Sequence, residues 1–93
     1  MDCDSIKFSR HAIERMFTRG IGEPDVLEIL LHGEMVEEYP DDTPYPSMLL
    51  LGWCNNKPLH LVAARDDESG TCIVITTYIP DTAHWGEDFK TRK

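Results

Sequence analysis

The chain has 93 residues and a formal net charge of -8, so we expect one domain with one core over residues 1–93 and no broad surface for a phosphate backbone. Its 41% hydrophobic and 28% charged content indicates a folded globular chain rather than a disordered one. The longest apolar run, Met48 to Leu51, is too short to span a bilayer, and the acidic start lacks the apolar segment of a secretory signal.

Two helices are predicted in the first third of the chain. Ser9 is a suitable N-cap and Gly20 a suitable stop for the first helix, and Pro24 and Gly33 mark the start and the end of the second. At 100° per residue, the first helix gathers its apolar side chains on one arc, which we expect to be buried: Ala12, Ile13, Met16 and Phe17.

Strand patterns follow the second helix. Four segments alternate apolar and polar side chains or are rich in β-branched residues: 34–39, 47–53, 59–65 and 72–79. The links between them are short and polar, which favours antiparallel neighbours. The sequence therefore predicts an α+β fold with two N-terminal helices packed on one face of a four-stranded antiparallel sheet.

The last segment, residues 80–93, is a polar tail. Trp85 and Phe89 lie four residues apart, a spacing that predicts one helical turn docked on the body of the protein. We expect Trp53, Trp85 and Tyr45 at the surface, where they would suit contact with a partner chain.

The cysteines and histidines do not predict a metal site. Cys3, Cys54 and Cys72 are an odd number without close pairing, which favours free thiols in the reducing cytoplasm. The spacings typical of zinc sites and of phosphate-binding glycine loops do not occur. We therefore expect no metal and no cofactor.

A basic row on the first predicted helix raises a question of function. His11, Arg15 and Arg19 recur every four residues, and two like charges at this spacing cost an isolated helix roughly 0.2 to 0.5 kcal/mol. One compensation is internal pairing with a carboxylate of the acidic residues after the second helix, which are Glu34, Glu37, Glu38, Asp41 and Asp42. The other is an external anion, most naturally a phosphate.

Three further polar residues lie within the predicted strands. His60 lies within the third predicted strand, so its ring either faces a cleft or is hydrogen-bonded in place. Thr76 and Tyr78 share one face of the last strand and offer hydroxyl groups. Ordinary structural roles explain each of these residues when it is taken alone.

Taken together, the runs SRHAIERMFTRGI, DVLEIL, GEMVEEYPDDTPYPSMLLLG, KPLHLVAA and ITTYIPD resemble a small prokaryotic family, domain of unknown function four-two-five-eight, over almost the whole chain. That family is similar in fold to RelE-type toxins and barnase-like ribonucleases. The resemblance implies metal-free RNA cleavage, RNA or another phosphate-bearing ligand, and a cognate antitoxin or other partner protein.

By the same resemblance, each candidate residue has a role. His11 and His60 would be the acid and base, Arg15 and Arg19 would stabilise charge on phosphorus, and Tyr78 would position the substrate. This reaction needs His60 and the basic row to converge on one cleft. RelE-type toxins are usually basic, so the acidic charge of this chain departs from their pattern and leaves room for the alternative of a non-catalytic interaction or regulatory module on the same fold.

Overall fold

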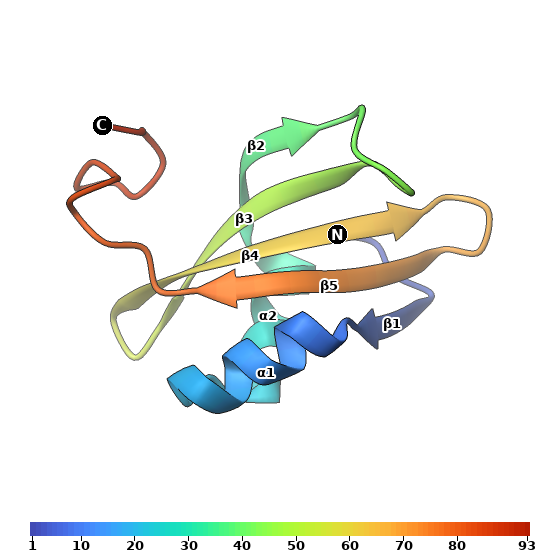
Figure 1. Cartoon of the computed structure of the whole chain (residues 1–93), viewed down its shortest axis with the longest axis horizontal. Helices are drawn as coiled ribbons and strands as arrows, with labels where there is room; N and C mark the ends of the chain where they lie inside the picture. Colours follow the sequence, from blue (N-terminus) through green and yellow to red (C-terminus); the bar gives the residue numbers. More distant parts are fainter.

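The chain forms one five-stranded sheet with the strand order β1-β5-β4-β3-β2, and the computed structural model describes residues 1–93. The elements in chain order are β1 (Ser5–Phe8), α1 (Arg10–Arg19), α2 (Glu23–His32), β2 (Glu34–Tyr39), β3 (Ser47–Cys54), β4 (Lys57–Asp66) and β5 (Thr71–Tyr78). Figure 1 shows α1 beside β5 and α2 behind the middle strands, with the C-terminal tail at the end of the sheet away from β1.

The predicted α+β architecture is confirmed, but the prediction of four antiparallel strands is wrong. Strands β2 to β5 form the expected antiparallel meander, and β1 adds a fifth strand that pairs with β5 in parallel. The segment Ser5–Phe8 does alternate polar and apolar side chains, but at four residues it has the minimum length for this signal and was not predicted as a strand.

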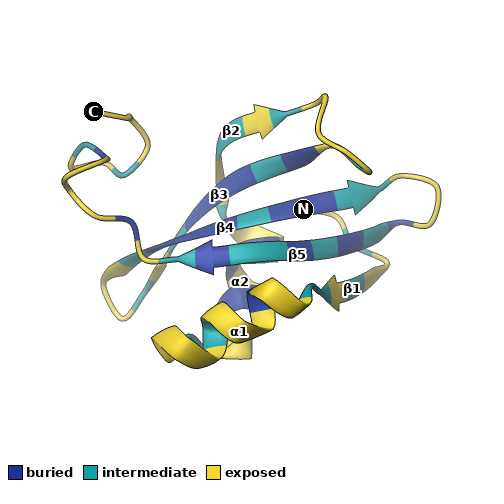
Figure 2. Cartoon of the chain, viewed as in Figure 1, coloured by how far each residue is buried: buried dark blue, intermediate teal, exposed yellow.

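The helix signals act as predicted at both ends of α1. The Ser9 side chain accepts a hydrogen bond from the Ala12 N–H at 3.0 Å, and Gly20 ends the helix in the left-handed conformation with φ 66°. The predicted buried arc is only partly correct, because Phe17 is 90% exposed and Ile13 is 55% exposed. Figure 2 shows how much of α1 is open to solvent, since this helix lies along one edge of the sheet.

Alternation along the central strands gives the sheet two different faces. The helix face carries Leu50, Leu61 and Val74, which form the main core with residues of both helices. The opposite face carries Leu49 and the side chains that pair with it in register on the neighbouring strands. We call this side of the sheet the tail face, because the C-terminal residues fold over it.

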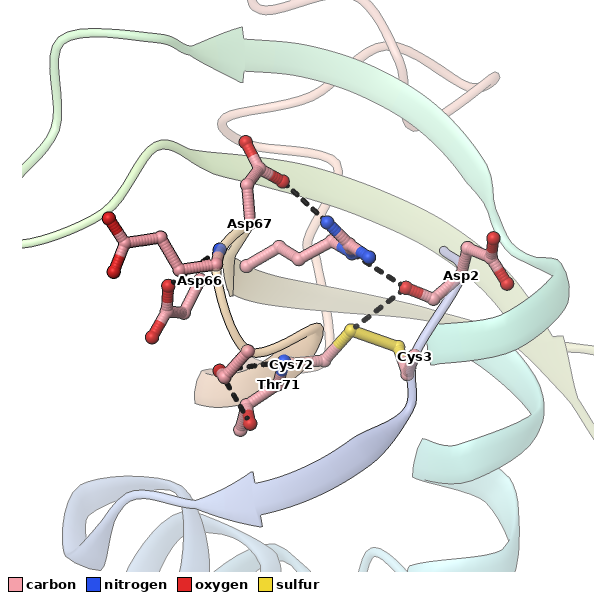
Figure 3. Close-up of polar contacts among 9 residues, drawn as sticks. Asp2, Cys3, Asp66, Asp67, Thr71 and Cys72 are labelled. Atoms are coloured by element: carbon pink, nitrogen blue, oxygen red, sulfur yellow. Dashed lines mark hydrogen bonds and ion pairs between the residues drawn. A yellow bond between two sulfur atoms is a disulfide. The ribbon is translucent and has the colours of Figure 1, made fainter.

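The cysteines depart from the expectation of three free thiols. Cys3 and Cys72 form a disulfide with a Cα–Cα distance of 5.6 Å, and Cys54 alone is free. Figure 3 shows this bond joining the segment before β1 to β5, close to the backbone of Asp2. The pairing was missed because 69 residues separate the two cysteines, and it removes the argument for a reducing compartment. No helix in the structure is long and apolar enough to cross a membrane.

Candidate functional site

The tail returns over the sheet and covers His60. Trp85 is 4% exposed, and its ring meets the His60 ring edge-on with 4.6 Å between the centroids. Phe89 packs its ring edge-on against Trp53 at 5.9 Å. The tail forms turns rather than the predicted helical turn, because the Asp88 carboxylate accepts from the backbone N–H groups of Lys90 and Thr91 and so stabilises a turn.

His60 is fully buried, and both of its ring nitrogens have partners. Nε2 lies 2.8 Å from the carbonyl oxygen of Phe89, and since a carbonyl can only accept, Nε2 carries the proton. In the neutral ring Nδ1 is therefore an acceptor, and the Tyr78 hydroxyl, 3.1 Å away, donates to it. The two residues are register partners on β4 and β5, which brings their side chains to the same face.

Burial sets the protonation of this pair. Desolvation lowers the pKa of His60 and raises the pKa of Tyr78, so at neutral pH the imidazole is uncharged and the phenol keeps its proton. Both shifts keep the proton on Tyr78, and the hydrogen bond to Nδ1 is the route by which that proton would reach the imidazole when another proton replaces it on the phenol oxygen.

A charged group lies next to this pair on the tail face. Arg92 Nε donates to Glu37 Oε1 at 2.8 Å, and its Nη2 donates to Oε2 at 3.2 Å. The Tyr39 hydroxyl also donates to Oε2, at 2.7 Å. These hydrogen bonds lower the pKa of the Glu37 carboxyl, and the hydrogen bond from Arg92 has the larger effect.

The guanidinium of Arg92 is held in a fixed orientation and remains reachable. It lies 4.6 Å from the centroid of the Trp85 ring, and its side chain is 60% exposed. The charges of Arg92 and Glu37 both act on the pKa of His60 and of Tyr78, so the four side chains form one electrostatic unit. The free edge of the guanidinium can bind an anion next to the hydrogen-bonded pair of His60 and Tyr78.

The structure brings together two of the five residues singled out in the sequence. His60 and Tyr78 are in contact on the tail face, whereas His11, Arg15 and Arg19 are exposed on α1, which packs against the helix face. The basic row therefore does not converge with His60 on one cleft.

Internal pairing does not compensate the arginines of the row either. Arg15 and Arg19 form no ion pair, while the carboxylates of Glu34 and Glu37 pair with Lys90 and Arg92 of the tail.

Sequence reasoning missed the contribution of the tail. Arg92 is 55 residues from Glu37 in the chain, and no local pattern links them. The alternation of Glu37 and Tyr39 did indicate that the two share a face. Of the aromatic residues expected at the surface, Trp53 is exposed, Tyr45 is half-buried, and the expectation for Trp85 is wrong because its ring fills the space over His60.

Comparison with protein families gives one result. A family model described as a domain of unknown function, DUF4258, matches residues 8–79, which include α1, α2 and the strands β2 to β5. No curated protein and no solved structure matches the chain. The tail that covers His60 lies after the matched region.

Proposed function

Because the chain belongs to DUF4258, a family of domains of unknown function, we propose its function from its own side chains: metal-independent cleavage of RNA on the tail face. The observation that carries the proposal is the hydrogen bond from the Tyr78 hydroxyl to Nδ1 of a neutral, buried His60, beside the exposed guanidinium of Arg92. A RelE-like or barnase-like fold, cytoplasmic RNA as the substrate and a cognate antitoxin as partner belong to the same proposal, by resemblance.

The proton path follows from the hydrogen bonds. The RNA 2′-hydroxyl gives its proton to the Tyr78 oxygen as the Tyr78 proton passes to His60 Nδ1. The 2′-oxygen then attacks the adjacent phosphorus, and the bond from phosphorus to the 5′-oxygen breaks. The proton returns from His60 through Tyr78 to the leaving 5′-oxygen, so both groups end as they began.

Each neighbouring group has one task in this scheme. The Phe89 carbonyl keeps a proton on Nε2, so Nδ1 is the nitrogen that takes up the Tyr78 proton and later returns it. Arg92, oriented by Glu37, stabilises the negative charge that grows on the phosphate oxygens. His60 acts through Tyr78 and needs no contact with the substrate, which is consistent with its full burial.

The test is cleavage of a defined RNA by the purified full chain in the presence of a chelator. We expect Tyr78→Phe to lower the cleavage rate by about 100-fold or more, the usual contribution of a general acid–base group. Tyr45→Phe is the matched control, because Tyr45 is also half-buried but lies away from His60. Arg92→Gln should lower the rate and Arg15→Gln should not. RNA left intact by the unmodified chain, or cut equally by Tyr78→Phe, contradicts the proposal.

One observation favours the alternative of a non-catalytic interaction or regulatory module. His60 is fully buried and both ring nitrogens are satisfied, an arrangement that also suits an anchor for the tail. In that case the unmodified chain leaves RNA intact, while His60→Gln and Tyr78→Phe lower the midpoint of urea unfolding more than Tyr45→Phe does.

A further inference from the structure

A hollow separate from the tail-face site lies where α1, α2 and the turn between β3 and β4 meet. Its volume is about 240 Å³, and its walls include Arg19, Asp25, Cys54, Lys57 and Leu59. Asn55 and Asn56 have positive φ values of 52° and 65°, which form a tight turn and place Lys57 opposite Cys54 in the hairpin of β3 and β4. Residues from three elements thus converge on one cavity.

The charges in this hollow are unbalanced. Arg19 and Lys57 both line it, and neither forms an ion pair or a side-chain hydrogen bond within the chain. The one carboxylate of the hollow, Asp25, does not pair with either cation. Its hydrogen bond with the Cys54 thiol raises the pKa of that thiol. Two cations are therefore left facing one cavity in a chain with a net charge of -8.

The remaining walls are apolar. Leu59 is buried at the base of the hollow, and Ile21 and Ile79 line it as well. A ligand with only a charged group would leave these side chains uncovered, whereas a compact apolar body attached to the charged group would cover them.

We propose that this hollow binds a small phosphate monoester, with Arg19 and Lys57 on the phosphate and the apolar body of the ligand against Leu59, Ile21 and Ile79. A guanidinium binds two phosphate oxygens at once, and a lysine ammonium adds a point charge beside it. The basic row is thus divided: Arg19 faces a ligand site and Arg15, one turn earlier, does not line the hollow. The proposal does not depend on the RNA-cleavage proposal, because no residue of the hollow belongs to the tail-face site.

The free thiol in the hollow gives a direct readout. Cys54 is the free cysteine of the chain, so the rate at which iodoacetamide alkylates the folded protein reports on this cavity alone. The probes are phenyl phosphate, inorganic phosphate and phenol, with affinity measured by calorimetry in parallel. We expect phenyl phosphate to protect Cys54 saturably, inorganic phosphate to do so at higher concentration, and phenol to give no protection.

Variants separate a site from general surface charge. Arg19→Gln and Lys57→Gln should each weaken phenyl phosphate binding about tenfold or more, the usual effect of losing a charge-assisted hydrogen bond. Arg15→Gln is the matched control, because Arg15 is an exposed arginine of the same helix that does not line the hollow. The proposal is overturned if phenyl phosphate gives no saturable protection, or if Arg15→Gln weakens binding as much as Arg19→Gln does.

Discussion

Reduction of the Cys3–Cys72 disulfide is expected to lower the free energy of unfolding by about 4 kcal/mol. The bond joins residues 69 apart in sequence, so it restricts most of the unfolded chain. In the chain-entropy account, a loop of this length corresponds to about 4.4 kcal/mol at 25 °C. A domain of this size has a total stability of roughly 5 to 14 kcal/mol, so the reduced protein should stay folded with a much smaller margin.

Urea unfolding of a Cys54→Ser variant, followed by tryptophan fluorescence with and without reductant, measures this effect. In this variant the disulfide is the only cysteine group that reductant can change. Reduction should lower the urea concentration at the unfolding midpoint by roughly 1.5 to 4 M, for the m values usual in small proteins. In the unmodified chain, denaturation without reductant should expose only the Cys54 thiol to a thiol reagent. Equal midpoints in the two redox states, or three reactive thiols in the unreduced chain, would refute the reasoning.

Three further outcomes are expected in urea unfolding. Gly52→Ala should lower stability by about 1 to 3 kcal/mol, because the new Cβ would overlap Cγ1 of Ile29 where α2 crosses β3. Gly22→Ala, with no neighbour closer than 3.6 Å, should cost only the roughly 0.5 kcal/mol of a poorer N-cap for α2. Trp85→Ala should cost about 3 to 5 kcal/mol, since it empties the space over His60. The free energy of unfolding should also fall as the pH drops below about 6.5. Below this pH His60 takes up a proton in the unfolded chain but not in the folded one, because burial lowers its pKa there. The His60→Gln variant should lack this fall in stability.

Local signals were sufficient for most of the fold. The N-cap at Ser9, the stop at Gly20 and the alternation along Glu34–Tyr39 each depend on residues a few positions apart, and each prediction is confirmed. The failures are non-local. Strand β1 is four residues long and is held by its pairing with β5, and the disulfide joins the segment before β1 to the same strand. The alternation in β1 covers only four residues, and the disulfide leaves no periodic pattern in the sequence.

The sequence predicted the strand residues of the candidate site but not the residue that the tail contributes. His60 and Tyr78 stand out because each is a polar group in an apolar strand, and antiparallel pairing brings the two strands together. Arg92 does not stand out, because it lies in a polar tail whose course depends on the burial of Trp85 and on the ion pair with Glu37. A segment without regular structure has no period that would predict where it docks.

One available signal places His60 opposite the basic row. Along β4, Leu59, Leu61 and Ala63 form the more apolar side, so this side is the one that two amphipathic helices should cover. His60 then faces away from the helices, whereas the basic row projects from α1 into solvent. Alternation along β4 therefore argues against a shared catalytic cleft. Arg15 and Arg19 have no ion-pair partner within the chain, and for Arg19 the hollow shared with Lys57 is where we propose that an anion binds.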